Sequence, residues 1–521
     1  MILSVLVVGL LAIVIDNTVL NVALKTIADP VGGLGASQSQ LEWAINSYTL
    51  VFAGLLFTFG VIGDRVGRKR MLMIGLALFG LGSLFSAYSS SPDMLIAARA
   101  VMGLGGAAVM PQTLSIISNV FEPAERARAI GIWASAVGIG VAIGPVLGGV
   151  LLTHFWWGSV FLINVPVTVL GAAAAFILVP ESRNPRPGKI DYIGVLASVV
   201  GLVLLVYGIV QGGDTGSWIR VDVLGPVAAG LVVLALFAWY ETRIEHPSLD
   251  VRLFRDRRLS ASVGAIALVF FGMGGVYFFT SFYLQNVRGY SPLDAGLLAI
   301  PFAAAQLVMA PRSAALVSRF GVRAVAGSGI LLNGLSIAGY VMLGTASPIW
   351  VLAVLYGIQG AGLGLAVPAT TSAVMDVLPR ERAGAGSALT NTARQVAVAL
   401  GVAVLGSILA ESYRSTMSPT LAALPAAARS TASQSISATQ AVAQHLGPAG
   451  RFLLGPANGA YVDAMHVTTL AATALALVGG IAIVRWLPGR ARPNIEELVA
   501  AEVAAAEREL VRQRELSDSE R

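Results

Sequence analysis

An acidic residue lies inside the first apolar run of this sequence. The run predicts a membrane helix over 2–24, with Asp16 roughly 12 Å from its end at a rise of about 1.5 Å per residue. A charged carboxylate at this depth is unfavourable unless it is paired, hydrated by a cavity or protonated. Asp16 is therefore a candidate proton carrier, and the alternative is a structural hydrogen-bonding role.

An arginine stands at a comparable depth in a later helix. Arg99 lies about six residues inside the predicted helix 93–118, so we expect it to face Asp16. The arginine would stabilise the charged carboxylate, and a conformational change that separated the two would remove that effect. Such a pair can couple protonation of the carboxylate to a conformational change of the protein. The alternative is an arginine whose side chain extends toward the membrane surface.

Other polar and aromatic residues are candidates for proton or substrate binding. Glu42 opens the predicted helix 41–63, where we expect it near the outer surface, with a weaker claim to be a second protonation site. Aromatic rings suit an apolar or cationic ligand. We expect substrate contacts from Asn17, Trp43, Asn46, Gln112, Phe279 and Tyr283. Arg312 and Arg394 also fall within predicted helices, where structural pairing and transport are equally open.

A short glycine-rich, charged segment separates the second apolar run from the third, 71–88. Its glycines allow a tight turn and close helix approach, and its aspartate can accept hydrogen bonds from nearby arginines. The residues that we expect to act as a gating loop are Gly60, Gly63, Asp64, Arg65, Gly67, Arg68 and Arg70.

The fifth predicted helix, 127–152, is rich in glycine around one proline. Glycine provides smooth faces for helix packing, and proline bends a membrane helix. The residues concerned are Gly138, Gly144, Pro145, Gly148 and Gly149.

Composition indicates a membrane protein that crosses the bilayer many times. The 521 residues are 56% hydrophobic and 12% charged, and the mean hydropathy is +0.77. Soluble domains carry about 25% charged residues. The sequence has no cysteine, its four histidines show no metal-ligand spacing, and it has no phosphate-binding glycine loop. We therefore expect neither an enzyme nor an ATP-driven pump, and no metal or other cofactor.

Windows of about 20 apolar residues give fourteen candidate helices. The spans not yet named are 158–179, 190–210, 222–240, 259–285, 293–317, 323–344, 349–377, 386–411 and 463–487. Lysine and arginine concentrate in alternate loops, which places both chain termini in the cytoplasm. The net charge of +6 then reflects topology rather than nucleic-acid binding.

The two halves of the chain are related in sequence. Gly103, Gly105 and Pro111 recur 257 positions later, whereas Arg99 is replaced there by Tyr356. Such repeats build transporters that rock about a site near the membrane midplane. We therefore expect four parts: a six-helix bundle over 1–180, two inserted helices within 181–258, a second six-helix bundle over 259–487 with a long extracytoplasmic loop at 412–462, and a cytoplasmic tail at 488–521.

These features together resemble the fourteen-helix drug:proton antiporter family of the major facilitator superfamily. The resemblance covers about residues 1–487 and depends mainly on the segments 16–24, 60–70, 95–106, 144–149 and 283–292. It implies an all-α major facilitator fold of two six-helix bundles related by a pseudo-twofold axis, with two inserted helices. It also implies proton coupling at Asp16 and Arg99 and gating by the Gly60–Arg70 loop. The sequence departs from the family pattern at Lys25, where a proline is usual, and at Ser318, where the second copy of the loop lacks an aspartate.

The resemblance implies a bacterial inner-membrane antiporter that is driven by the proton gradient. We expect it to export amphipathic, cationic or zwitterionic drugs by alternating access, as a monomer in the lipid bilayer, with the drug and the proton coupled through Asp16. The alternatives are a dedicated exporter of one endogenous metabolite or lipid, a proton-coupled importer, and a membrane sensor that transports nothing.

Overall fold

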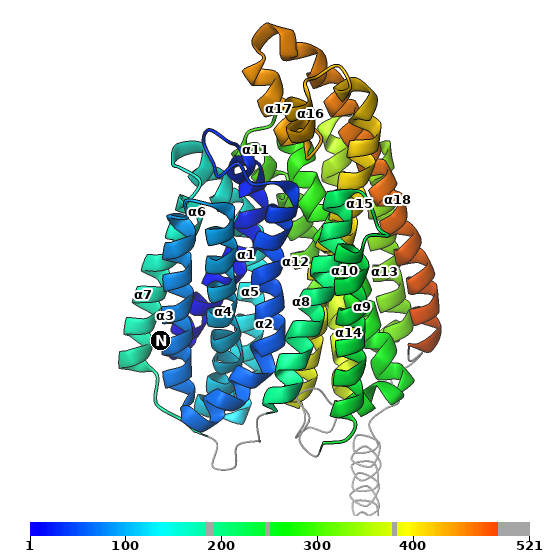
Figure 1. The fold of residues 1–521 in the computed structure, drawn as a ribbon. Coiled ribbons are helices and arrows are strands. Elements are labelled where there is room, and N and C mark those ends of the chain that lie inside the picture. The colour runs from blue at the N-terminus through cyan, green and yellow to red at the C-terminus, as the bar shows by residue number, and fades with distance from the viewer. Residues whose placement is uncertain (184–190, 245–250, 378–382, 488–521) are drawn as a thin grey trace, which may run out of the picture.

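The computed structural model describes residues 1–183, 191–244, 251–377 and 383–487, and in these residues every regular element is a helix. The predicted tail 488–521 lies outside the described residues. The helices run side by side as two bundles, and the chain passes from the first bundle to the second through an intermediate pair (Figure 1). The prediction of an all-α chain is confirmed.

The first bundle contains seven helical segments. In chain order they are α1 (Ile2–Ala28), α2 (Gln38–Val66), α3 (Arg68–Ala87), α4 (Pro92–Val120), α5 (Pro123–His154), α6 (Ser159–Leu162) and α7 (Asn164–Leu178). Serine side chains define two of the starts, because Ser37 caps α2 with a full capping box and Ser91 caps α4 ahead of a proline in its first turn.

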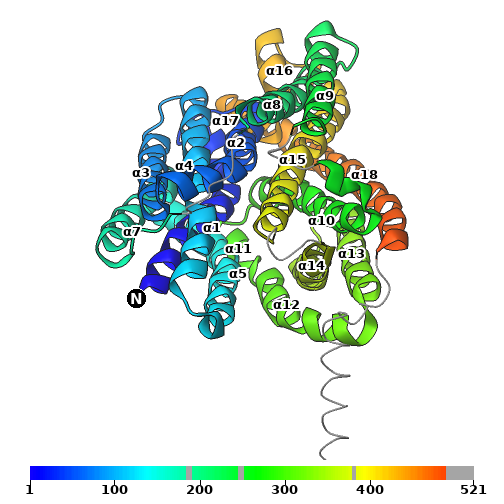
Figure 2. The same ribbon diagram turned by 90° about the horizontal axis from the view of Figure 1, so that it is seen from below.

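The second bundle repeats this plan, as the view along the helices shows (Figure 2). Its segments are η1 (Val251–Arg255), α10 (Arg257–Phe282), η2 (Tyr283–Val287), α11 (Pro292–Leu297), α12 (Ile300–Phe320), α13 (Val322–Gly339), η3 (Tyr340–Met342), α14 (Ile349–Val377), α15 (Ala383–Leu421) and α18 (Leu454–Trp486). The element η2 is a turn of π-helix, a local widening that often marks a functional position in a helix.

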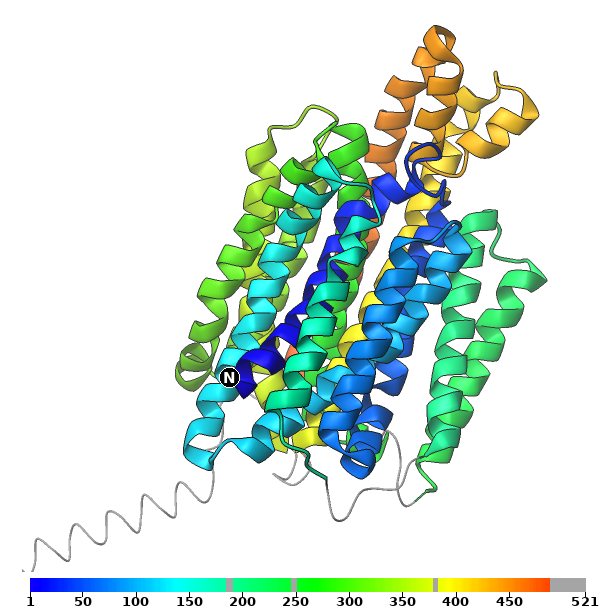
Figure 3. The same cartoon turned by 90° about the vertical axis from the view of Figure 1, so that its left-hand side faces the viewer.

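The inserted pair α8 (Tyr192–Thr215) and α9 (Val221–Glu241) stands at one edge of the molecule (Figure 3). Helix α8 packs against α2 of the first bundle and α15 of the second. Ser407 of α15 donates a hydrogen bond to the Ile209 carbonyl at 3.0 Å, and Arg414 donates one to the Gly213 carbonyl at 3.1 Å. The inserted pair therefore covers one side of the junction between the bundles.

Most of these helices are long and apolar enough to cross a bilayer. Among the described residues twelve helices meet this test, and α2 is a thirteenth if its two parts, which meet at 55°, form one span. Helix α5 adds 32 residues of continuous helix. The structure thus agrees with the fourteen spans that the sequence predicts.

The internal repeat is visible in how the helices cross. In the first bundle, a Cβ atom added to Gly75 of α3 would lie 3.0 Å from the Gly105 carbonyl of α4. In the second, a Cβ on Gly329 of α13 would lie 2.6 Å from the Gly362 carbonyl of α14. Gly329 follows Gly75 by 254 positions and Gly362 follows Gly105 by 257, so the repeat preserves a crossing that only glycine permits.

The predicted long loop 412–462 is largely helical. Helix α15 continues to Leu421 and α18 begins at Leu454. Between them lie α16 (Ala426–Ala432), α17 (Ile436–His445) and η5 (Gly447–Leu453), which rise above the bundles in Figure 1. We call this end of the molecule the cap side. Its alanine-rich sequence favours helix, and Ser435 caps α17.

The glycine crossing provides a test of the packing in the second bundle. We expect Gly362→Ala to destabilise the protein by about 1–3 kcal/mol through overpacking, because its Cβ would lie 2.7 Å from the Gly329 carbonyl. Gly357→Ala, on the same helix, meets nothing within 4 Å and should be neutral or stabilising, because alanine favours helix. Thermal unfolding of the protein in detergent measures both. Equal effects of the two substitutions would contradict this account of the crossing.

Candidate functional site

Asp16 and Arg99 form a buried ion pair inside the first bundle. Each side chain is only 1% exposed. An Arg99 Nη1 proton is donated to Asp16 Oδ2, and the Asn164 amide donates to Asp16 Oδ1 at 3.0 Å. Arg99 Nε also donates to the Ala44 carbonyl at 3.2 Å. Helices α1, α2, α4 and α7 thus converge on one charge pair, and the sequence predicted its two members but not Asn164.

Aromatic rings enclose the arginine of this pair. The Arg99 guanidinium lies 4.4 Å from the centre of the Tyr48 ring and 5.8 Å from that of Phe161, both within the range of cation–π attraction. Tyr48 stacks on Phe52, with ring centres 5.7 Å apart. These contacts exclude water from the pair, which strengthens the attraction between its charges.

A hydrogen bond from Asn17 joins this shell to the centre of the molecule. Asn17 Nδ2 donates to the Tyr48 hydroxyl at 3.2 Å and to the Ile13 carbonyl at 2.9 Å. Asn17 lines the central cavity, whereas its neighbour Asp16 does not. Among the described residues, Arg99, Tyr48 and Asn17 form a chain of contacts from the buried carboxylate to the cavity.

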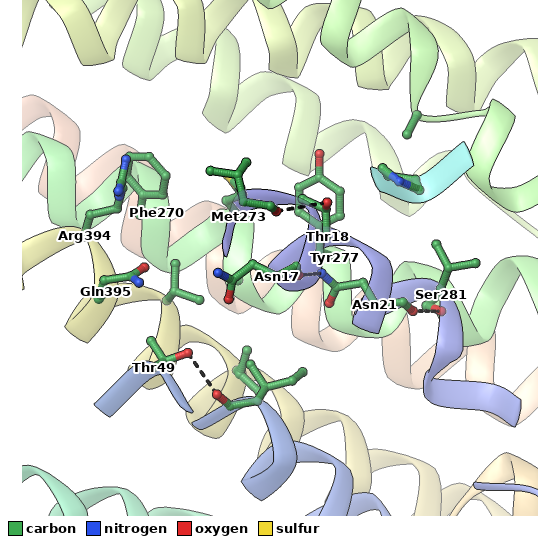
Figure 4. A pocket seen from close by; sticks show the side chains of 18 of the residues that line it. Asn17, Thr18, Asn21, Thr49, Phe270, Met273, Tyr277, Ser281, Arg394 and Gln395 are labelled. Atoms are coloured by element: carbon green, nitrogen blue, oxygen red, sulfur yellow. Dashed lines mark hydrogen bonds between the residues drawn. The ribbon is translucent and has the colours of Figure 1, made fainter. Parts of the chain in front are cut away.

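The central cavity lies between the two bundles and has a volume of about 200 Å³. Side chains of α1, α2, α10 and α15 form most of its wall. Figure 4 shows Arg394 and Gln395 at one end of the cavity and Asn21 and Ser281 at the other, with Asn17 and Thr18 between them. Aromatic residues line the space between these ends: Phe52, Phe270, Tyr277 and Tyr356. Tyr277 and Tyr356 stack with ring centres 6.4 Å apart.

The bundles are joined between this cavity and the cap side. Gln285 Nε2 donates to the Val22 carbonyl at 2.8 Å, and Lys25 Nζ donates to the Gln285 carbonyl at 2.6 Å. Ser281 Oγ donates to the Asn21 carbonyl. These contacts connect α1 of one bundle with the end of α10 and the π-turn of the other. The cavity is therefore closed toward the cap side.

The glycine-rich helix α5 packs against the helix that carries Asp16. A Cβ on Gly144 would overlap the Thr18 side chain of α1, and one on Gly148 would lie 3.0 Å from Val19. Gly149 faces the second bundle, where an added Cβ would lie 2.7 Å from the Pro292 carbonyl.

The other two predicted residues of α5 have different places. Pro145 lines the cavity, and Gly138 lies in a part of α5 whose side chains are only partly described. Pro145 and the smooth glycine faces of α5 thus lie at the junction of α1, α5 and the second bundle.

The charged turn between α2 and α3 is held by a residue that the sequence analysis missed. Gly67 has φ +125°, a conformation that L-residues rarely adopt, and a Cβ there would lie 2.6 Å from the Glu181 carboxylate. Glu181 accepts a hydrogen bond from the Lys69 backbone at 3.2 Å and lies 3.7 Å from Arg70 Nε. Its position just after a predicted helix gave no sign of this role.

The remaining loop residues pack along α2 and its end. Asp64 pairs with Arg68 at 2.8 Å, and Arg65 lies in the last turn of α2. Gly60 packs on Pro111 of α4, and a Cβ on Gly63 would overlap Gln112.

Glu42 lies near the start of α2, as expected, but it is buried rather than solvated. It is 2% exposed and lies against Gly406 of α15, where an added Cβ would overlap its carboxylate. Gln38 Nε2 donates to Glu42 Oε1 at 3.4 Å, whereas Oε2 has no hydrogen-bond partner among the described residues. The second bundle and α8 cover this end of α2. The sequence gives only the depth of Glu42 along its helix, not the helices that cover it. A carboxyl group buried without a cation is most stable in its neutral form.

Of the six residues expected to contact substrate, Asn17 is the one that lines the cavity. Trp43 faces Tyr207 of α8, and Phe279 packs edge-on against Tyr340. Tyr283 donates to the Gly344 carbonyl at 2.8 Å.

The other two expected substrate residues are fully buried away from the cavity. Gln112 donates to the Phe59 carbonyl at 2.9 Å, whereas the Asn46 amide has no hydrogen-bond partner. The residues that do line the cavity include Arg394, Gln395 and Val398, whose helical spacing on α15 was the available signal.

Comparison with known proteins identifies the architecture. A sequence profile of the Major Facilitator Superfamily matches residues 6–402. The fold resembles the crystal structure of a bacterial homologue of the human lysosomal transporter Spinster, in an inward-facing and unoccupied conformation. That comparison has a TM-score of 0.65 and 18% identity, and it covers 95% of this chain and 98% of the other. The predicted fold class is thereby confirmed.

Two curated relatives share more of the sequence. The chain is 36% identical to the multidrug resistance protein Stp of Mycobacterium tuberculosis. The alignment spans 414 residues, or 79% of this chain and 76% of the relative. The chain is also 33% identical to the multidrug efflux pump LfrA of Mycolicibacterium smegmatis. That alignment spans 483 residues, or 92% of this chain and 95% of the relative.

The buried pair can be tested by a double-mutant cycle. Removing one member of a buried pair leaves the other charge without its partner and costs about 3–5 kcal/mol. We therefore expect Asp16→Asn and Arg99→Met each to lower the thermal midpoint of the protein in detergent, and the double variant to lower it by less than the sum of the two. Additive effects would show that Asp16 and Arg99 do not stabilise each other.

The Gly67 turn makes a second prediction. Gly67→Ala combines an unfavourable φ with a clash against Glu181, so we expect the turn to open and trypsin to cleave faster at Arg68, Lys69 or Arg70. Gly289→Ala is the matched control, because Gly289 also has a positive φ, of 68°, but an added Cβ meets nothing within 4 Å. Unchanged cleavage in Gly67→Ala would contradict the proposed packing on Glu181.

Proposed function

Because the chain belongs to the Major Facilitator Superfamily, we propose that it is a proton-coupled antiporter that exports amphipathic drugs or antibiotics by alternating access. The proposal places it in the fourteen-helix drug:proton antiporter family and in a bacterial inner membrane. It also places both termini in the cytoplasm and treats the chain as a monomer that needs protons and substrate but no cofactor. Support comes from relatives named as a multidrug resistance protein and a multidrug efflux pump, which cover most of the chain.

The observation that carries the proposal is the connection between Asp16 and the cavity. A proton on Asp16 removes the negative charge that Arg99 faces, and Arg99 keeps its contacts with the Ala44 carbonyl and the Tyr48 ring. Tyr48 in turn holds Asn17 in the cavity wall. Protonation can therefore change the wall that the substrate touches, without the substrate touching Asp16.

The positions of the glycines and of the closing hydrogen bonds support alternating access. For the cavity to open toward the cap side, α1 must separate from η2, which requires Lys25 and Gln285 to exchange their partners. The small faces of α5 against α1 and α11 allow this movement without large side chains in the way. The Gly67 turn lies at the far end of α2, where it can limit the motion of α2 relative to α3.

Glu42 supports a second protonation site in the same proposal. Its carboxyl group lies between the bundles, packed on Gly406, and it has an oxygen without a hydrogen-bond partner. Movement of α15 away from α2 would give this oxygen access to water. Glu42 would then release a proton when the bundles separate and take it back when they close.

The experiment is transport by the full chain in proteoliposomes with an imposed proton gradient. Ethidium, 10-methylacridinium and anthracene-9-carboxylate serve as probes. We expect the wild type to move at least one of them, the movement to collapse with an uncoupler, and Asp16→Asn to lose it. Asp93→Asn, an exposed acid in the first turn of α4, is the matched control and should behave as wild type.

Other outcomes would change the proposal. Unchanged transport by Asp16→Asn would move the coupling site elsewhere, and Glu42→Gln would then be the variant to lose transport. Transport that ignores the proton gradient would exclude antiport with protons. Movement of none of the probes by the wild type would contradict drug export.

A further inference from the structure

The central cavity contains one charged side chain among its described lining residues, and that side chain is an arginine. Arg394 extends from α15 at one end of the cavity, beside Gln395 and the ring of Phe270 (Figure 4). The guanidinium lies 5.5 Å from the centre of that ring. No aspartate or glutamate is among these lining residues, so the described wall is electropositive.

Arg394 has most of its hydrogen-bonding capacity unused within the described part of the chain. Its Nη2 donates to Asn391 Oδ1 at 2.7 Å, and no described carboxylate lies within salt-bridge distance of it. A guanidinium offers five N–H donors in a planar fork that matches a carboxylate. An arginine inside the membrane without a counter-ion is costly and marks a functional site.

Two buried acids of the first bundle, Asp16 and Glu42, face groups other than Arg394. Asp16 faces Arg99 and Asn164 inside the first bundle and does not line the cavity. Glu42 faces Gly406 and Gln38, and it does not line the cavity either. Among the described residues Arg394 therefore has no carboxylate partner, and an anionic ligand could supply one.

We propose that the cavity binds amphipathic compounds through an anionic group, such as a carboxylate or a phenolate, which pairs with Arg394. The aromatic body of the compound lies between Phe270, Tyr277 and Tyr356, and a neutral polar group reaches Asn21 and Ser281 at the other end. This inference rests on the proposed export function and specifies its substrate class. It differs from the expectation from the sequence, which favoured cations or zwitterions.

The test is binding of two probes that share a flat three-ring frame and carry opposite charge. Anthracene-9-carboxylate is an anion at pH 7, and 10-methylacridinium is a permanent cation. Fluorescence titration of the full chain in nanodiscs of phosphatidylcholine should show tighter binding of the anion. Arg394→Gln should weaken anion binding by at least about tenfold, the effect of losing one charge-assisted hydrogen bond, and leave cation binding equal or stronger. Arg394→Lys should retain part of the anion binding.

The matched control is Arg312→Gln, because Arg312 is also an arginine within a membrane-spanning helix but is exposed and lies outside the cavity. It should bind both probes as the wild type does. Preserved cation binding by Arg394→Gln shows that this variant is folded. Tighter binding of the cation by the wild type, or equal binding of the anion by wild type and Arg394→Gln, would overturn the inference.

Two further results separate this inference from the export function. Arg394-dependent binding of the anion without transport of any probe would support the site and contradict export. Transport of probes with no dependence on Arg394 would support export and overturn the site. Adding phosphatidylglycerol to the nanodiscs distinguishes the source of the anion. If it displaces anthracene-9-carboxylate the ligand is a lipid headgroup, and if it does not the ligand is a free amphipathic anion.

Discussion

A carboxylate and a guanidinium that pair inside a membrane bundle are no longer hydrated. Their charges are stabilised by each other and by a few neighbouring dipoles. For Asp16 and Arg99 these dipoles are the Asn164 amide and the Ala44 carbonyl, and the faces of Tyr48 and Phe161 complete the enclosure. A proton that binds or leaves here therefore changes the energy of the packing between four helices. This change bears on the cavity, because Tyr48 also accepts a hydrogen bond from Asn17, and Asn17 lines the cavity.

The internal repeat makes the two bundles alike in packing and different in chemistry. The glycine crossings at Gly75–Gly105 and Gly329–Gly362 are equivalent, so the helices meet in the same way. At the position of Arg99, however, the second bundle has Tyr356, which stacks on Tyr277 in the cavity. The first bundle thus holds a buried charge pair, and the second provides aromatic surface and the arginine of the cavity.

The sequence could predict the positions of the helices and the depth of a residue along its helix. Counting residues from the helix end placed Asp16 and Arg99 at one depth, and the apolar runs gave the helices. The sequence could not predict which way a side chain faces when every face is apolar. Trp43 and Glu42 are adjacent, yet one contacts α8 and the other contacts Gly406 of α15. Phe279 and Tyr283 lie on α10 and η2, as expected, but turn into their own bundle rather than toward the cavity. Only the neighbouring helices decide between these faces.

The cationic lining at Arg394 has an electrical consequence for an exporter. If the transported compound is an anion, its outward movement and the inward movement of a proton carry charge in the same direction across the membrane. A potential that is negative inside then drives both halves of the exchange, by about 2.3 kcal/mol per elementary charge at 100 mV. A cationic compound would instead cancel the charge of the proton, and the exchange would depend on the pH difference alone. If one compound is exchanged for one proton, the charge of the compound that pairs with Arg394 would decide whether membrane voltage contributes to the exchange.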